Sequence, residues 1–273
     1  MSKKVKIFVV SHSPEEIVKI QSDEVYTPLF VGRNGRENLG FLSDDEGDEI
    51  SAKNPHYCEL TGLYWMWKNT SAEVIGLCHY RRHFKGKNSE KISEDEIIEY
   101  LNDYDVILPK KNTLVKGTYW ETYKNHYFGD ALNITREVIN DLFPDYLKTF
   151  DDVLSQGSFH NYNMFICDKK LADEYCRWVF AILREVENRI NLDDYPRVLG
   201  LISEAILNVW VKHHDLKVKE VDVSYLGFSL KLRMWISHNV FIRKLYSFLY
   251  KHILSSSVGE SIDKKMTNRY NKL

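Results

Sequence analysis

The stretch "GLCHYRRHF", residues 76–84, places two adjacent arginines directly after an apolar run. Guanidinium groups bind phosphate oxygens through paired, charge-assisted hydrogen bonds, so Arg81 and Arg82 are candidates for holding an anion such as a diphosphate. His79 and Tyr80 precede them and would support the arginines or contact the ligand. The alternative is a strand that reaches solvent. Neighbouring residues of a strand point to opposite faces, so the two arginines need not both contact one ligand. The hypothesis requires only one of them to bind the anion.

Other apolar runs end in polar residues too. Ser11 and His12 close the run "KVKIFVVSH" at 4–12, and "DVILPKK" at 105–111 ends in two lysines. Ligands of open α/β sheets bind beyond the carboxyl ends of the strands. We therefore expect these endings to converge at one edge of a sheet.

The elements that would position these residues alternate between strand and helix. Leu60, Leu63, Tyr64 and Trp67 follow the helical period. Short apolar, β-branched runs bounded by turn residues predict strands. Strands are expected at 4–12, 26–32, 73–80, 105–110, 162–169 and 216–226, and helices from 57, over 93–104, through much of 118–154, from 169 to about 190, and over 200–214. This order predicts an α/β fold with a mostly parallel sheet flanked by helices.

The sequence lacks the motifs of several common classes of enzyme and metal site. The glycine-rich signatures of Rossmann dehydrogenases and P-loop enzymes are absent, as is G-x-S-x-G. His79 and His83 are expected on or just after a strand, where a spacing of four does not form a zinc pair. Twelve residues counted from Asp44 end at Pro55 rather than at the glutamate of an EF-hand, so 44–49 is expected to be a solvated acidic loop. No metal site and no cofactor are predicted.

Charge and composition further restrict the functional class of the protein. The 273 residues carry a net charge of −2, which does not suggest binding to nucleic acid. Residues 228–273 nevertheless hold nine Lys or Arg and two acidic residues, and so form a basic extension of an acidic body at 1–227. The four cysteines show no C-x-x-C or zinc spacing. There is neither a signal peptide nor an apolar run of about 20 residues, so a cytoplasmic location is expected.

Five segments together resemble one bacterial family, first catalogued as domain of unknown function 4422 and found in capsule and O-antigen gene clusters. They are "NPHYCELTGLYWMWKN" (54–69), "GLCHYRRHF" (76–84), "DVILPKK" (105–111), "YNMFICDK" (162–169) and "GLISEAILNVW" (200–210). The resemblance runs from about residue 4 to 226. One departure is Ser-Glu-Ala-Ile at 203–206, where many relatives have Ser-Glu-Arg-Leu.

The resemblance implies a glycosyltransferase with a GT-A-like, Rossmann-type mixed sheet. It implies transfer of a hexose, with galactofuranose as the leading candidate, from a UDP-sugar to a glycan acceptor in surface-polysaccharide synthesis. Such enzymes usually hold the diphosphate through an Asp-x-Asp and a divalent metal. That acid pair is missing here, so Arg81 and Arg82 are expected to stabilise the diphosphate. An inverting transferase needs a base for the acceptor hydroxyl, and Glu204 is the candidate; the alternative is an ordinary exposed helical glutamate.

The resemblance also suggests weaker site residues. Ser11 and His12 lie where uridine or its phosphates bind in such folds, or else cap the strand. Asp48 would contact the ribose or cap a turn, and Asn163 would contact the donor sugar or the local backbone. Aromatic and imidazole side chains would line the acceptor subsite, and the candidates are Tyr123, His126 and His160. The alternative is that these three residues belong to the core or to the surface.

The basic extension contains an aromatic, amphipathic segment at 230–254. Such a helix would adsorb to the inner face of the plasma membrane, where a lipid-linked acceptor is presented, or pack on the body or on a partner. Two other functional classes stay open. One is a non-catalytic nucleotide-sugar or carbohydrate binding module, which needs the cations but no base. The other is a sugar-phosphate hydrolase, for which no metal or nucleophile is found.

Overall fold

The structure, a computed structural model, describes residues 3–88, 91–114, 117–123 and 129–226, which belong to one compact unit ending at Leu226. Its centre is a mixed sheet with the strand order β2-β1-β3-β8-β5-β9. Of these six strands only β8 runs antiparallel to its neighbours. The strands are β1 (Val5–Ser11), β2 (Tyr26–Phe30), β3 (Val74–His79), β5 (Val106–Pro109), β8 (Phe165–Asp168) and β9 (Val218–Val221). The mostly parallel α/β sheet predicted from the sequence is confirmed.

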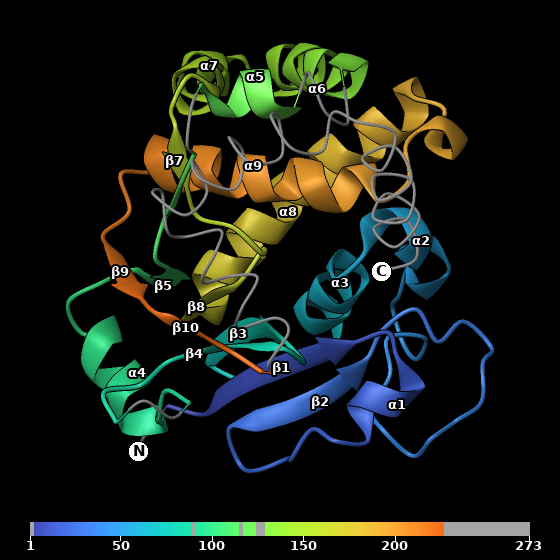
Figure 1. Ribbon diagram of the computed structural model, residues 1–273, viewed down its shortest axis with the longest axis vertical. Coiled ribbons are helices and arrows are strands. Elements are labelled where there is room, and N and C mark those ends of the chain that lie inside the picture. The colour runs from blue at the N-terminus through green and yellow to red at the C-terminus, as the bar shows by residue number, and fades with distance from the viewer. Residues whose placement is uncertain (1–2, 89–90, 115–116, 124–128, 227–273) are drawn as a thin grey trace, which may run out of the picture. The chain divides into compact units, whose positions relative to one another are not determined.

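Helices surround this sheet (Figure 1). The α-helices are α1 (Pro14–Ile17), α2 (Asn54–Tyr57), α3 (Leu60–Asn69), α4 (Glu94–Leu101), α5 (Tyr119–Tyr123), α6 (Gly129–Leu142), α7 (Leu147–Leu154), α8 (Lys169–Arg189) and α9 (Val198–His213). Single 3₁₀ turns lie at Ser51–Lys53, Pro144–Tyr146 and Leu192–Asp194. Helices α5, α6 and α7 form the outermost layer in the view of Figure 1, and α8 and α9 lie between that layer and the strands.

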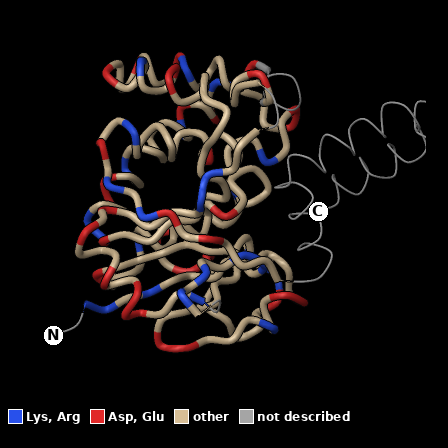
Figure 2. Tube along the Cα trace, turned by 60° about the vertical axis from the view of Figure 1, so that its left-hand side comes forward, with Lys and Arg blue, Asp and Glu red and all other residues tan. Residues whose placement is uncertain are grey.

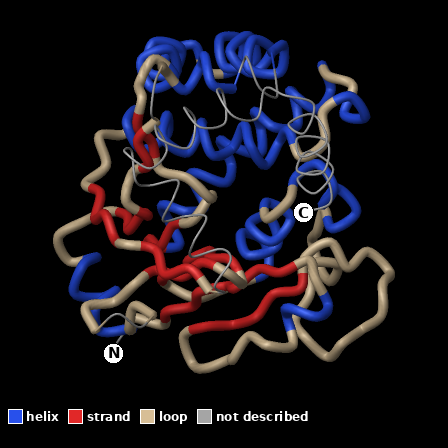
Figure 3. The backbone as a smooth tube through the Cα atoms, in the orientation of Figure 1, coloured by secondary structure: helices blue, strands red, loops and turns tan. Residues whose placement is uncertain are grey.

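The alternation of side chains along β1 explains the two cores. Val5, Ile7 and Val9 pack with α4 on one face, whereas Phe8 and Val10 pack on the other with the remaining large helices. Figure 3 shows how much more helix covers this second face. Helix α3 approaches the sheet closely at Gly62, where a Cβ atom would lie 2.9 Å from a methyl carbon of Val10. The larger core therefore supports the carboxyl edge of the sheet from the side of α3 and α9.

Two predicted elements are divided in the structure. The run 216–226 forms β9 and then β10 (Val223–Tyr225), which pairs antiparallel with the short β4 (Arg82–Phe84). Strand β3 does not run on into solvent, because His79 pairs with Arg82 across a tight turn and His83 and Phe84 return to the core. A two-stranded sheet of β6 (Asn112–Thr113) and β7 (Ser158–Phe159) completes the fold.

Acidic and basic side chains are interspersed over the described residues, as Figure 2 shows. Within those residues, every helix is too short or too polar to span a bilayer. The basic extension expected at 228–273, with its amphipathic segment 230–254, lies outside the described residues. The division at 227 and the membrane contact therefore stay predictions.

Candidate functional site

The polar strand endings meet at the carboxyl edge of the sheet. Val10 lies opposite His79 in the register of β1 and β3, and Leu77 lies opposite Phe165 in that of β3 and β8. Because β8 runs antiparallel, its first residues lie at the same edge as the last residues of β1 and β3. The residues just before β8, Tyr162 and Asn163, therefore join the site.

Tyr162 uses its backbone to connect two functional side chains. Its carbonyl oxygen accepts a hydrogen bond of 2.7 Å from His79 Nε2. Its amide donates a hydrogen bond to the carboxyl group of Glu204. Glu204 thus lies at the carboxyl edge and is partly buried. This is not the freely exposed helical glutamate of the alternative interpretation.

The protonation of Glu204 is shifted by its surroundings. Burial, followed by the negative charge of Glu59, raises the pKa of Glu204 to about 7 from an ordinary value of 4.5. The Tyr162 amide and the charges of Arg82 and Arg197 act in the opposite direction. A carboxyl group with a pKa near 7 is about half ionised at neutral pH and suits general-base chemistry.

Glu59 contacts the site through Asn163. Asn163 Nδ2 donates to Glu59 Oε1 at 2.6 Å and to the carbonyl oxygen of Gly200 at 3.0 Å. Asn163 is 2% exposed, and its Oδ1 is buried without a hydrogen-bond partner among the described residues. An unsatisfied buried acceptor is unfavourable in the free protein, which makes this oxygen a candidate contact for a ligand hydroxyl.

The backbone is strained around this group. Cys58, Tyr162, Asn163 and Arg197 have φ angles of 52°, 77°, 52° and 62°, values that favour glycine. Such conformations persist where the surrounding structure requires them, and they cluster at functional sites. Here they turn the chain sharply at the start of α3, β8 and α9.

Two of these strained residues contact each other near a glycine. Arg197 Nε donates to Cys58 Sγ at 3.4 Å. Gly200, in the first turn of α9, lies so close that an added Cβ would be 3.0 Å from the Cβ of Cys58. Glycine at this position therefore lets α9 approach the α2–α3 junction and brings Glu204 to the same site as Glu59.

The two arginines of the opening motif have different surroundings. The guanidinium carbon of Arg82 lies 4.6 Å from the ring centroid of Tyr162. Arg82 Nε is buried with no hydrogen-bond partner among the described residues. Arg81 instead pairs with Glu16 at 3.1 Å and packs over Tyr80 at 4.9 Å. The charge of Arg81 is therefore partly compensated by a neighbouring acid.

His12 lies in a positive region. Desolvation of the ring, followed by the charges of Arg197, Arg36 and Arg81, lowers the pKa of the His12 imidazole, while Glu59 opposes this effect. The His12 ring also makes an edge contact with Tyr80, at a centroid distance of 6.3 Å. Fixed guanidinium charges around a strand end favour binding of an anionic ligand.

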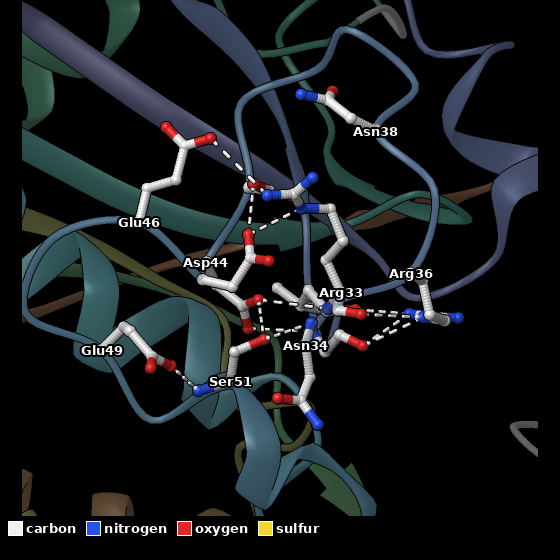
Figure 4. Close-up of polar contacts among 12 residues, drawn as sticks. Arg33, Asn34, Arg36, Asn38, Asp44, Glu46, Glu49 and Ser51 are labelled. Carbon is white, nitrogen blue, oxygen red and sulfur yellow. Dashed lines mark hydrogen bonds and ion pairs between the residues drawn. The ribbon is translucent and has the colours of Figure 1, made fainter.

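Arg36 joins the loops that follow β1 and β2. Its guanidinium donates to the carbonyl oxygens of His12 at 3.2 Å, Val31 at 3.2 Å and Gly32 at 2.8 Å. It also lies 4.8 Å from the ring centroid of Phe30. Figure 4 labels Arg36 and draws hydrogen bonds of its guanidinium as dashed lines. We infer that it holds the His12 loop in place.

The acidic loop 44–49 agrees only in part with the expectation of a solvated loop, because residues 46–49 are exposed whereas Asp44 is buried. Asp44 is fully buried and accepts hydrogen bonds from the Gly32 amide at 2.9 Å and the Ser51 hydroxyl at 2.6 Å. Arg33 pairs with Asp45 at 2.7 Å. The loop is folded around Asp44 because its backbone amides need an acceptor. In the described part of the chain, no three His, Cys, Asp or Glu side chains lie together as a metal site requires.

The remaining predicted residues are spread more widely. Ser11 is buried and exchanges hydrogen bonds with the Ser13 backbone, as in strand-end capping. Asp48 accepts from Tyr64 Oη at 3.0 Å, beside α3 rather than among the groups around Glu204. Tyr123 ends α5, but its side chain and the whole of His126 lie outside the described residues.

His160 occupies a core position, one of the alternatives that the sequence left open. It is 3% exposed, and its ring donates to the Pro109 carbonyl oxygen at 3.1 Å. Burial lowers the pKa of His160 to about 3, so the ring is neutral. Asn208 connects the backbone of His160 to that of Glu204 with hydrogen bonds of 2.9 and 2.8 Å. His160 therefore supports α9 from behind the site.

Three residues of this site were missed from the sequence: Glu59, Tyr162 and Arg197. Glu59 and Tyr162 lie inside motifs that the family resemblance rests on, next to residues that were singled out. Arg197 lies in an unremarked polar stretch, "DDYPRVLG". Left-handed backbone at non-glycine residues has no signal in a single sequence.

Comparisons with known proteins add to this geometry. The family model described as Domain of unknown function (DUF4422) matches residues 6–215. A solved apo structure, described as the WbbM bifunctional glycosyltransferase, is similar with a TM-score of 0.74 and 27% sequence identity. The match covers 82% of this chain but only 46% of that one, so the chain spans about half the length of this structural relative. No curated protein matches the sequence.

Proposed function

This chain belongs to the DUF4422 family, and from that premise we propose that it is a glycosyltransferase. It transfers a hexose from a UDP-sugar donor to a glycan acceptor in bacterial surface-polysaccharide synthesis, and galactofuranose is the first sugar to test. The proposal is supported by the similarity to half of a bifunctional glycosyltransferase. The observation that carries it is the partly buried Glu204 carboxyl, which accepts from the Tyr162 amide, has a pKa near 7 and lies within reach of the charges of Arg82 and Arg197.

The proposed reaction is an inverting displacement. The acceptor hydroxyl oxygen forms a bond to the anomeric carbon while the bond from that carbon to the diphosphate oxygen breaks. The hydroxyl proton passes to Glu204, and the electron pair of the broken bond leaves with UDP. Glu204 suits the role because its carboxylate is held by the Tyr162 amide and its pKa lies close to the working pH.

The leaving diphosphate needs positive charge nearby. Arg82 has a buried Nε that finds no hydrogen-bond partner in the described part of the chain, and Arg197 and Arg81 both contribute to the positive region at His12. We expect Arg82 to supply the larger share, because Arg81 is paired with Glu16. Guanidinium groups that are already in place stabilise developing negative charge without reorganising.

A thermal-shift screen of UDP-sugars, with and without EDTA, tests the donor class. One donor should raise the melting temperature more than UDP alone does, and the shift should survive chelation. Release of UDP in the presence of a glycan acceptor then tests transfer. If UDP-sugars bind but neither transfer nor hydrolysis is found for any acceptor, the chain is a nucleotide-sugar binding module. If no nucleotide sugar binds, the proposal is wrong.

A further inference from the structure

Glu59 has no part in the reaction as written above, yet it lies in the middle of the site. It immediately precedes α3, and its carboxylate is partly buried. Within the described residues no Lys, Arg or His nitrogen lies within ion-pair distance of it, and its hydrogen bond is the 2.6 Å contact from Asn163 Nδ2. A carboxylate that is partly buried and bonded to an amide rather than paired with a cation is unfavourable, so its presence calls for a reason.

The contact with Glu59 determines the orientation of the Asn163 carboxamide, that is, which positions its nitrogen and its oxygen occupy. Carboxylate and carbonyl oxygens only accept, so Glu59 and the Gly200 carbonyl both require the amide nitrogen of Asn163. The oxygen Oδ1 is then the atom left without a partner among the described residues. Only a donor satisfies it, and a sugar hydroxyl is such a group.

We propose, on the basis of the function proposed above, that Glu59 is a positioning residue with two effects. It fixes the Asn163 carboxamide so that its oxygen accepts from a hydroxyl of the bound sugar. Its negative charge keeps Glu204 basic enough to take the acceptor proton near neutral pH.

The second effect follows from the placement of the two carboxylates, because the adjacent residues Asn163 and Tyr162 donate to Glu59 and Glu204 respectively. Arg82 from β4 and Arg197 at the start of α9 lower the pKa of Glu204, whereas Glu59 raises it. The neutral Cys58 thiol also faces Glu204, and His12 and His79 face Glu59. Without Glu59, burial alone of the two raising causes remains against the two arginines, so the pKa of Glu204 falls and its carboxylate becomes a weaker base that is ionised at lower pH.

The Glu59→Gln substitution tests the electrostatic effect without an assay of turnover. The protonation of Glu204 is followed by ¹³C NMR of side-chain carboxyls in the whole chain, with the resonance assigned by its loss in Glu204→Gln. In Glu59→Gln the midpoint of the Glu204 titration should fall by about one pH unit. The matched control Glu137→Gln, on the exposed face of α6, should leave it unchanged. An unchanged midpoint in Glu59→Gln overturns this part of the proposal.

Glu59→Asp tests the hold on Asn163, because it keeps the charge but shortens the side chain. We expect the Glu204 midpoint to stay within about 0.3 pH units of wild type, while kcat falls roughly tenfold and the affinity for UDP changes less than about twofold. A wild-type kcat in Glu59→Asp overturns the positioning role. A loss of UDP affinity as large as the loss of kcat overturns it as well. If the wild-type chain transfers no sugar at all, the proposed function and the hold on a sugar hydroxyl fail together, but the NMR midpoint still decides the electrostatic effect.

Discussion

The guanidinium of Arg82 lies over the ring of Tyr162, and the Tyr162 backbone hydrogen-bonds both His79 and the carboxyl of Glu204. A single residue with left-handed backbone therefore joins the cationic side of the site to the carboxylate proposed as its base. Because these groups share one support, their positions relative to each other are set by β8 and α9. This relationship leads to the predictions below.

Replacement of Glu204 by glutamine should abolish transfer while leaving donor binding nearly intact. Glutamine keeps the shape but cannot take a proton, so turnover should fall about 10²- to 10⁴-fold. UDP affinity, measured by calorimetry, should change less than about twofold, since the carboxylate does not contact the diphosphate in the proposed reaction. Glu137→Gln is the control. Wild-type turnover in Glu204→Gln would show that Glu204 is not the base.

The rate of transfer should depend on pH through Glu204. Its pKa is raised to about 7 and the base must be ionised, so kcat should rise with pH and level off above about 8. At pH 6 roughly a tenth of Glu204 is ionised, and the rate should be about a tenth of the plateau. The measurement is initial UDP release at saturating substrates. A flat profile from pH 5.5 to 8.5 would contradict the assignment.

The same pKa predicts an effect on stability. In the folded protein Glu204 has a pKa near 7, against 4.5 for an ordinary carboxyl group. Between pH 4.5 and 7 the unfolded chain therefore releases this proton more readily than the folded protein does, and the free energy of unfolding falls as the pH rises. Glutamine does not ionise. The Glu204→Gln variant should therefore be more stable than wild type at pH 8, by about 3 kcal/mol, with a smaller difference at pH 5. Urea unfolding at both pH values measures this, and an equal difference at the two would count against it.

Arg82 and Arg81 should differ in their effect on nucleotide binding. Arg82→Gln removes the charge that stacks on Tyr162, and we expect roughly a tenfold loss of UDP affinity and a larger loss of kcat. Arg81→Gln should cost less than about threefold, because Arg81 already pairs with Glu16. Calorimetry with UDP compares the two variants. The reverse order of effects would assign the diphosphate to Arg81.

The approach of α9 to the α2–α3 junction is testable at Gly200. An added Cβ would meet Cys58, so Gly200→Ala should destabilise the fold by about 1 to 3 kcal/mol. Cys58→Gly removes the opposing atoms and relieves the left-handed backbone. The double variant should then be more stable than the sum of the single effects predicts, as measured by a thermodynamic cycle in urea. If the two single effects on the free energy of unfolding were strictly additive, the strain would not arise from the contact between Gly200 and Cys58.

Much of the fold was predictable because hydrophobic periodicity determines it. Val5, Ile7 and Val9 alternate with Phe8 and Val10, and this pattern alone indicated β1. Leu60, Leu63 and Tyr64 likewise indicated α3. The meeting of Ser11 and His79 at one edge followed from the rule for parallel strands.

The rest depends on contacts between distant segments. The turn between His79 and Arg82 sends β4 back to pair with β10, a partner far along the chain. Nothing near residue 44 reveals that Asp44 is buried beneath the amide of Gly32. Glu59 was overlooked because only the folded chain brings it to Asn163.

The site draws on segments as far apart in the chain as Glu59 and Glu204, with Asn163 between them, and α9 contributes last. During synthesis from the N-terminus, a nascent chain that has emerged from the ribosome only as far as β8 contains Arg81 and Arg82 but lacks both Arg197 and the proposed base. Such a chain would be unable to consume its donor. Under the proposed function, the order of the segments would thus delay chemistry until nearly all of the described fold has left the ribosome.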